Sequence, residues 1–432
     1  MNKKLSRREA IKFSGSGLGA LSLAGLGPFN KLLSPTALAQ GAGKQDNHLV
    51  IIQLHGGYSA SFSSARSFLN NGNFGGITDN NMLRLGNGLT MHNSFNSLPA
   101  SVLQNYTATV GLQHGQSSHP GARSRLFMVQ NNLSVLHYLA SGMGGPGAIK
   151  FAFTDGRGSS VPKAGNLNGT SLQKVTDMDG LIEALGSGTP GPYSPPSREF
   201  TTEALIAAEK ISMPNIQANA QLSTLGNGLS SGIETLKQPV QTFDPNSLLN
   251  AYSLNSRVVS KASLASQLAC AELLMLSNTN VTLCRQPDWD THGDANMREA
   301  FRKMRTEIIP ALSVFVRRVF GDPDNNVAPL PEFENKNVTI AIIGDFTRTA
   351  PKSGHGTGLA ATVISKNVKT GSTANVNQRG DIANNTPNVG AFWSFLASMA
   401  GAPQTTVSEI VGLGGNGTQA GLNSHLAALS RL

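Results

Sequence analysis

Nine residues in the middle of the chain, QPDWDTHGD at 286–294, combine aspartates, a histidine and a tryptophan. They follow NVTLC (280–284), a short β-branched run that predicts a buried strand. Carboxylate and imidazole are the ligands that zinc and similar divalent ions take from proteins. Asp290 and His292 are two residues apart, and in an extended segment this spacing puts both side chains on one face. The stretch predicts either a metal site, with Trp289 packed into the core to hold the loop, or a polar turn without chemistry.

The same residue types follow the other apolar runs. Strands are predicted at 48–54, 106–112 and 337–343, and more weakly at 148–153, because these runs are short, apolar and rich in β-branched residues. Ligands of open α/β sheets bind beyond the carboxyl ends of the strands. The exits contain five of the nine histidines and several aspartates: His55, His114, His119, His292, His355, Asp290, Asp294 and Asp345. This clustering predicts a metal or phosphate-type site at the exits, with a polar rim as the alternative.

The segment SSHPGARSR (117–125) supplies a candidate nucleophile. Pro120 is favoured in the first turn of a helix, which would place Ser118 at a helix N-terminus. Helix N-termini favour anions, and Arg123 or Arg125 could pair with a phosphate or sulfate there. The alternative is that Ser118 and its histidine neighbour only cap a helix.

The elements that must position these residues indicate an α/β fold. Helical patterns at about 247–276, 297–320 and 388–401 alternate with the predicted strands, and Pro310 is expected to kink the second of them. Such alternation predicts one mainly parallel sheet with helices on both faces. We expect a single domain at 40–432, with long polar loop insertions at 154–200, 321–335 and 366–387.

The N-terminus and the composition point to an exported protein. Only 14% of the residues are charged, and a basic start is followed by a weakly apolar, Gly-rich run and by ALAQ, which offers a small-residue cleavage pattern at Ala39. Arg7 and Arg8 in SRREAIK resemble a twin-arginine export signal, although that pattern usually carries Phe where this chain has Ala10. We expect a twin-arginine-type signal peptide at 1–39, the translocase of that route as a partner, and a periplasmic or secreted protein. An ordinary secretory signal or a membrane anchor is the alternative.

Charge and hydropathy exclude several classes of partner. Residues 1–39 contain six Lys/Arg and one Glu, so removing their net +5 from the total of +9 leaves +4 for 40–432. With no dense Lys/Arg run after the signal, nucleic acid is not expected as a partner. The weak hydrophobicity of the N-terminal run argues against a stable membrane anchor.

The two cysteines are expected to be buried free thiols. Cys270 lies in a predicted helix and Cys284 ends the following strand. A helix packs roughly 10 Å from a sheet, whereas a disulfide needs Cα atoms within about 7 Å. The spacing therefore favours thiols over a bridge.

Several segments together resemble a known family. LVIIQLHGG, VGLQHGQSSHPGARSRLF, WDTHGD, GDFTRT and GHGTG resemble, in order, the bacterial family catalogued as domain of unknown function 1501. Its members are exported by the twin-arginine route and are grouped with the alkaline phosphatase and sulfatase superfamily. The resemblance covers most of 40–432, and WDTH at 289–292 is its most specific piece. It implies an alkaline phosphatase/sulfatase-like sheet in which, in active hydrolases, two divalent ions flank a Ser or Thr nucleophile and the transferring group.

The chain departs from this family at two acidic positions. The family's first motif reads roughly Arg-Gly-Gly-x-Asp-Gly where this chain has HGGYSA from His55, and its last motif has Asp where this chain has Gly354. A full two-metal site is therefore not expected. The resemblance then implies one divalent ion, zinc or calcium, or none, with these ligands: Asp290, His292, Asp345 and His355.

The resemblance also implies a function. Ser118 would be the nucleophile, with His119 and Arg123 completing the catalytic set and Arg123 clamping the anion. The expected activity is metal-dependent hydrolysis of phosphate or sulfate esters of a small molecule or glycan. The alternative is a degenerate member that binds a ligand or partner at the cell surface without turnover. The missing carboxylates favour the alternative, and the retained WDTH and GHG favour the enzyme.

Overall fold

The computed structural model describes residues 46–144, 149–154, 165–168, 170–184 and 245–432, with a few short stretches between 203 and 214. The signal peptide expected at 1–39 lies outside the described residues. No helix in the described ranges is long and apolar enough to cross a membrane.

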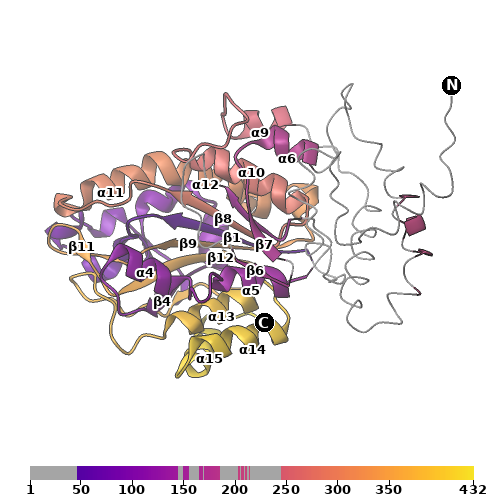
Figure 1. The fold of residues 1–432 in the computed structure, drawn as a ribbon. Helices are drawn as coiled ribbons and strands as arrows, with labels where there is room; N and C mark the ends of the chain where they lie inside the picture. Colours follow the sequence, from indigo (N-terminus) through magenta and orange to yellow (C-terminus); the bar gives the residue numbers. More distant parts are fainter. Residues whose placement is uncertain are drawn as a thin grey trace.

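One large sheet forms the centre of the molecule (Figure 1). Its strand order is β13-β4-β12-β9-β1-β8-β5-β7-β6. The strands are β1 (Asn47–Leu54), β4 (Thr107–Gln113), β5 (Phe151–Thr154), β6 (Asn166–Leu167), β7 (Thr170–Lys174), β8 (Val281–Gln286), β9 (Asn337–Gly344), β12 (Gly358–Ser365) and β13 (Gly371–Ser372). Neighbouring strands pair in parallel, except that β12 is antiparallel to β4 and β9 and β6 is antiparallel to β7. The prediction of an α/β fold with a mainly parallel sheet is confirmed.

Strand β12 decides which loops meet. It was not predicted from the sequence, and it lies between β4 and β9 in the opposite direction. Because of that direction, its first residue, Gly358, pairs with Gln113, the last residue of β4. The segment before β12 therefore reaches the same edge of the sheet as the carboxyl ends of β1, β4, β8 and β9.

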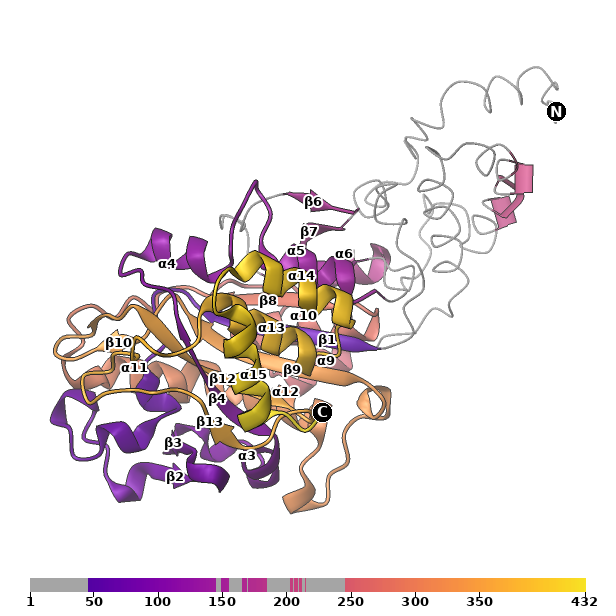
Figure 2. The same cartoon turned by 90° about the horizontal axis from the view of Figure 1, so that it is seen from below.

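Helices cover both faces of the sheet (Figure 1). On one face α10 (Leu264–Leu276) packs against β5 and β8 and against α12 (Ile309–Phe320). On the other face α5 (Val135–Gly142) contacts β5, β7 and β8, while α13 (Val389–Met399) contacts β4. Helices α14 (Gln404–Gly414) and α15 (Thr418–Leu429) pack on α13, and Figure 2 shows these three helices together over the sheet.

Shorter elements complete the described fold. The remaining helices are α3 (Ala100–Tyr106), α4 (His119–Leu126), α6 (Met178–Ala184), α9 (Pro245–Ala251) and α11 (Arg298–Lys303). Two small antiparallel pairs lie outside the main sheet: β2 (Met82–Arg84) with β3 (Thr90–His92), and β10 (Arg348–Thr349) with β11 (Gly354–His355). In Figure 1, α4, α11 and β11 gather at one end of the sheet.

Two expectations about the elements need correction. The helix expected at 247–276 is two helices, because the segment between them forms a bridge in which Val259 N–H donates to the carbonyl oxygen of Thr176 and Met178 N–H donates to that of Arg257. The segment 154–200 is not only loop, since β6, β7 and α6 lie within it. An irregularity was expected at Pro310 in the helix at 297–320, and there a π turn at Met304–Ile308 comes just before Pro310 in the first turn of α12. Proline lacks the backbone N–H that a regular helix would use there.

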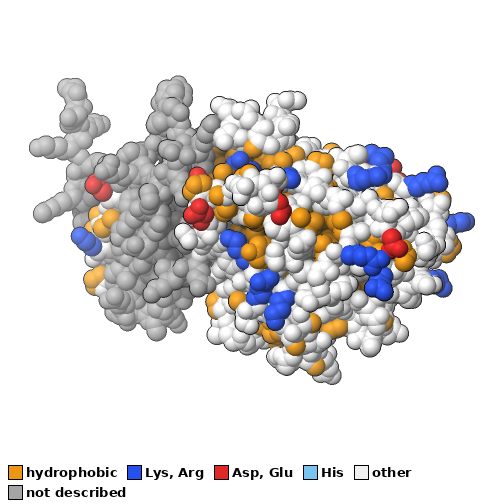
Figure 3. All heavy atoms as spheres, turned by 180° about the vertical axis from the view of Figure 1, so that it is seen from behind, with side chains coloured by type: hydrophobic (Ala, Val, Ile, Leu, Met, Phe, Trp, Pro, Cys, Tyr) orange, Lys and Arg blue, Asp and Glu red, His pale blue; other side chains and the backbone are white. Residues whose placement is uncertain are grey.

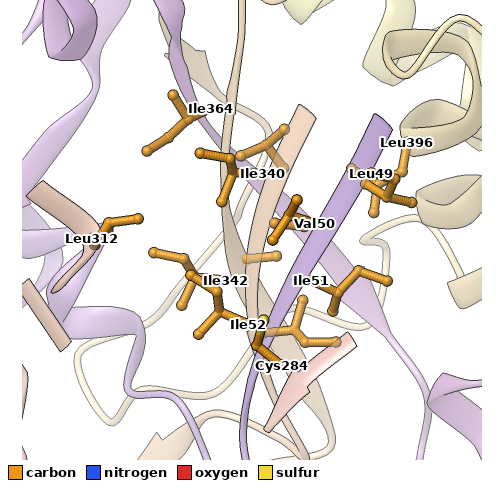
Figure 4. Close-up of a cluster of buried hydrophobic side chains, with 14 of the residues drawn as sticks. Leu49, Val50, Ile51, Ile52, Cys284, Leu312, Ile340, Ile342, Ile364 and Leu396 are labelled. Atoms are coloured by element: carbon orange, nitrogen blue, oxygen red, sulfur yellow. The ribbon is translucent and has the colours of Figure 1, made fainter. Parts of the chain in front are cut away.

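The hydrophobic core lies between the sheet and its helices. Side chains of β1 alternate: Leu49 and Ile51 lie on the side of Leu396 in α13, whereas Val50 and Ile52 lie on the side of Leu312 in α12 (Figure 4). This alternation is why a strand covered on both faces is apolar throughout. Cys270 and Cys284 are buried free thiols in this core, as predicted. On the face shown in Figure 3, the Lys and Arg side chains of the described residues are spread out and form no single basic patch.

Candidate metal centre

Four side chains converge at the carboxyl edge of the sheet. His119, Asp290, His292 and His355 each offer one ligand atom, and these atoms all lie within 4.8 Å of one another. Three imidazoles and one carboxylate could hold a metal ion, and the set is typical of zinc sites. The opening stretch 286–294 is therefore part of a convergent site, as Asp290 and His292 predicted.

Three different loops bring these residues together. His119 is the first residue of α4, which follows β4. Asp290 and His292 follow the end of β8 at Gln286. His355 ends β11, three residues before β12 begins at Gly358. The antiparallel direction of β12 thus brings the fourth candidate ligand, His355, to the edge where the parallel strands end.

His119 is oriented by Asp345, which follows β9. The Asp345 carboxylate is fully buried, and its Oδ2 accepts a hydrogen bond of 2.8 Å from Nδ1 of His119. Arg123 donates to the same oxygen at 2.9 Å, and Gln53 donates to Oδ1 at 3.3 Å. With Nδ1 occupied, His119 turns Nε2 towards Asp290, whose Oδ2 is 3.3 Å away. A carboxylate behind a ligating histidine commonly fixes its tautomer and ring orientation.

His355 is oriented in a similar way by a backbone carbonyl. Its Nδ1 donates to the carbonyl oxygen of Ser117 at 2.5 Å. Its Nε2 is buried and has no hydrogen-bond partner among the described residues. Burial lowers the pKa of His355 and outweighs the opposing hydrogen bond to Ser117. A neutral imidazole with a free, buried Nε2 fits a metal ligand.

Asp290 is held by a buried arginine. Arg348 is only 1% exposed, and its Nη2 donates to Asp290 Oδ1 at 2.8 Å and to the carbonyl oxygen of Trp289 at 3.2 Å. The carbonyl oxygens of Gly56 and Ser353 also accept from this guanidinium. Burial acts to raise the pKa of Asp290, but the hydrogen bond and charge of Arg348 outweigh it and leave the pKa below its usual value. The carboxylate is therefore ionised and ready to bind a cation.

The Gly-Gly pair after β1 gives this arginine its space. A Cβ on Gly56 would lie 2.2 Å from the backbone nitrogen of Asp290, and a Cβ on Gly57 would lie 2.5 Å from Nε of Arg348. Both glycines also have φ values, +128° and +145°, that other residues rarely adopt. The loop after β1 thus contributes backbone contacts to the site rather than a carboxylate.

The candidate nucleophile caps a helix. Ser118 is exposed, and its Oγ accepts from the backbone N–H of Gly121 at 3.3 Å, which makes it the N-cap of α4. It stands in the chain between Ser117, whose carbonyl binds His355, and the cluster residue His119. Ser118 is therefore beside the cluster, but its hydroxyl is engaged in capping.

Other predicted site residues divide between the cluster and its surroundings. Asp345 lies behind His119 and is not one of the four clustered residues, whereas His119, expected among the catalytic residues, is one of them. Asp294 accepts the backbone N–H groups of Glu299 and Ala300 and so caps the start of α11. Trp289 is buried, as predicted. Asp345 also affects His55 and His114, but burial outweighs its charge and lowers the pKa of both, that of His114 to about 4.

The sequence missed the part that Arg348 plays. The residue was noted only within GDFTRT, as part of the resemblance, and no role was predicted for it. The sequence signal that could have pointed to this role is an arginine soon after a buried apolar strand, because a charged side chain that becomes buried needs hydrogen-bond and charge partners. Which partners these are depends on three loops that are distant in the sequence.

Comparison with known proteins gives no further information about the site. No family model matches the chain, and neither a curated protein nor a solved structure matches it.

Proposed function

We propose that this protein is an exported, metal-dependent hydrolase of phosphate or sulfate esters with a single zinc ion. The observation that carries the proposal is the convergence of three histidines and Asp290, with Nδ1 of His119 and His355 each already bonded to an oxygen. Nitrogen-rich sets of this kind favour zinc, whereas calcium takes oxygen ligands. A divalent ion there would act as a Lewis acid towards an ester oxygen and lower the pKa of a nearby hydroxyl or water.

The charges around the site support an anionic substrate. The carboxylates of Asp290 and Asp345 are paired with the guanidiniums of Arg348 and Arg123, respectively. These four charges cancel, so a bound divalent ion would leave the centre with net positive charge. Such a centre attracts phosphate or sulfate groups and stabilises the charge that develops on them.

Two residues of the α4 segment are positioned to handle the ester. Arg123 is 28% exposed and uses one Nη1–H on Asp345, which leaves further N–H groups for an anion. Ser118 presents an exposed hydroxyl at the N-terminus of α4, where the helix favours negative charge. In the proposal Ser118 is the nucleophile and gives up its capping bond to Gly121 when it attacks.

A non-catalytic metal-binding protein is the second candidate. It is favoured by the hydrogen bond that Ser118 makes to Gly121, because a capping serine needs no catalytic role. It is also favoured by the missing carboxylate after β1, because this chain has Ser59 at the position of the family's Asp. In this alternative the ion would fix the loops for a ligand or a partner at the cell surface.

The proposal also covers the family to which the protein belongs and its location in the cell. The resemblance to the domain of unknown function 1501 family, and through it to the alkaline phosphatase and sulfatase superfamily, is consistent with a metal cluster at the strand ends of an α/β sheet. The twin-arginine pattern at Arg7 and Arg8 supports export to the periplasm or beyond.

Turnover of simple esters tests the proposal. Zinc-loaded and chelator-treated protein would be assayed with p-nitrophenyl phosphate and p-nitrophenyl sulfate, alongside Ser118→Ala and His292→Ala. We expect zinc-dependent turnover of one ester, reduced roughly a hundredfold or more in both variants. Stoichiometric zinc without turnover of either ester would support the non-catalytic candidate. Zinc-dependent turnover that survives Ser118→Ala would remove the serine from the mechanism.

A further inference from the structure

A cavity lies beside α4. Its volume is about 370 Å³, within the range of about 300–1,000 Å³ that small-molecule sites occupy. Its walls come from the end of β4, from α4 and the turn after it, and from the facing ends of α13 and α14. None of the residues that form the metal cluster lines it.

Helix α4 separates this cavity from the metal centre. His119 and Arg123, four residues apart, face Asp345 on one side of the helix. Gly121, Ser124 and Arg125 line the cavity. Successive residues of a helix are about 100° apart, so these three lie on the opposite side from the first two. The two arginines of the segment are thus divided between the two sites.

The cavity has free polar groups but no acid. Gln116, Ser124, Arg125 and Gln130 are exposed, and none of their side chains makes a hydrogen bond or ion pair within the described part of the chain. Among the described residues that line the cavity, none is Asp or Glu. The guanidinium is therefore the dominant charge, and the amides and hydroxyl offer both donors and acceptors.

Part of the remaining wall is apolar, and it includes a helix start. Met128, Val129, Val389 and Leu413 supply apolar surface, while Gln113, His114 and Asn388 are polar. Val389 is the first residue of α13, and the positive end of that helix adds to the field of Arg125. A ligand that fits this wall has one anionic group, several hydroxyls and a small apolar face.

We propose that this cavity binds a small hydroxylated organic anion of the sugar-acid type, with its carboxylate on Arg125 and its hydroxyls on Gln116, Ser124 and Gln130. The site is distinct from the metal centre and does not rest on the hydrolase proposed above. It also differs from a general anion trap, because three neutral hydrogen-bonding side chains line the same cavity as a single cation.

Binding of gluconate to the full chain tests the proposal. Isothermal titration would be run in chelator, so that no ion at the metal centre can hold the probe, with the uncharged polyol sorbitol as the comparison. We expect saturable binding of gluconate, and binding of sorbitol weaker by about tenfold or more, because a charge-assisted hydrogen bond to Arg125 is lost. Arg125→Gln should weaken gluconate binding by a similar factor. The control Arg84→Gln removes the same charge from an exposed site paired with Asp79, outside the cavity, and should leave binding unchanged.

Any of three results would overturn the proposal. The first is that wild type shows no saturable binding of gluconate, the second that Arg125→Gln binds gluconate as tightly as wild type does, and the third that Arg84→Gln loses as much affinity for gluconate as Arg125→Gln. Ser124→Trp provides an independent check, because a bulky side chain on this exposed helical position would fill the cavity and should abolish binding. If gluconate still binds the Ser124→Trp protein as tightly as wild type, the ligand lies elsewhere.

Discussion

Removing His292 should separate a metal centre from a polar turn. His292 belongs to the cluster, yet its side chain is 52% exposed, so the fold depends little on it in the absence of an ion. Surface substitutions of this kind usually change the free energy of unfolding by about 0.5 kcal/mol or less. Any larger effect of His292→Ala must come through the bound ion.

The size of the effect follows from mass action. An ion at a hundredfold excess over its dissociation constant stabilises the folded state by about 2.7 kcal/mol. For domains of 150–250 residues, 1 kcal/mol moves the melting temperature by roughly 2–4 °C, and by somewhat less in a longer chain. Wild type should therefore melt about 5 °C higher in zinc than in chelator. His292→Ala loses one of four ligands and should lose most of that difference.

The assay is a set of thermal melts in zinc and in chelator, with His55→Ala as the matched control. His55 is also a histidine at a strand exit of this edge, but it is not one of the four clustered residues. Its substitution should change the melting temperature by the same small amount in both buffers. Equal melting of wild type in zinc and in chelator would refute the metal centre. If His55→Ala and His292→Ala lose the same amount of the melting-temperature difference between zinc and chelator, the zinc effect does not come from the cluster.

Three further predictions concern the support of the site, the core and export. Asp345→Asn keeps all four clustered side chains but removes the charge behind His119, and should weaken zinc binding by about 10–100-fold in a titration; unchanged affinity would contradict the orienting role. His425 is fully buried, and burial lowers its pKa from 6.5 to about 4. The folded state therefore resists protonation of His425, and the free energy of unfolding should fall by at most about 3 kcal/mol as the pH drops from 6.5 to 4. Urea unfolding of His425→Leu should show a smaller loss between these pH values, and an equal loss would assign the acid sensitivity to other groups. Replacing Arg7 and Arg8 by lysines should retain the precursor in the cytoplasm, and normal cleavage and export of this variant would point to the general secretory route.

The sequence predicted the strands that carry the strongest local signal. The runs at 48–54, 106–112, 280–284 and 337–343 correspond to β1, β4, β8 and β9, because strands buried on both faces must be apolar throughout. Their exits converge for a reason that needs no side-chain detail: parallel strands end at the same edge. Asp290 and His292 were found in this way.

Strand β12 shows what such reasoning lacks. Its sequence GLAATVIS is rich in small residues, and such residues carry a weaker strand signal than Val or Ile. Even a predicted strand would not have revealed its antiparallel direction, because direction is set by pairing with β4 and β9. Yet that direction is what brings His355 to the metal centre.

The roles of Asp345 and His119 were also beyond the sequence. Both residue types can bind zinc, and both follow strands that end at the same edge. Only the packing shows that Asp345 is fully buried against Gln53 and Arg123, so that it bonds Nδ1 of His119 from behind and is not itself one of the four clustered residues. Residue type and spacing predict a set of candidate ligands, and burial decides which of them could face an ion.

The balance of charge explains why one ion is the better expectation than two. A second divalent ion would need acidic ligands, which the Gly-Gly loop after β1 and Gly354 before His355 do not supply. The loop after β1 has Ser59 at the position of the family's Asp, and in the same loop the carbonyl oxygen of Gly56 accepts a hydrogen bond from the guanidinium of Arg348. Arg348 is buried and positively charged, and it binds both Gly56 in the loop after β1 and Asp290 in the loop after β8. It thereby connects the two loops, which a second ion could also do. The departures from the family motif at Ser59 and Gly354 are therefore compatible with the proposed centre, in which Arg348 would hold the loops and a single ion would face the substrate.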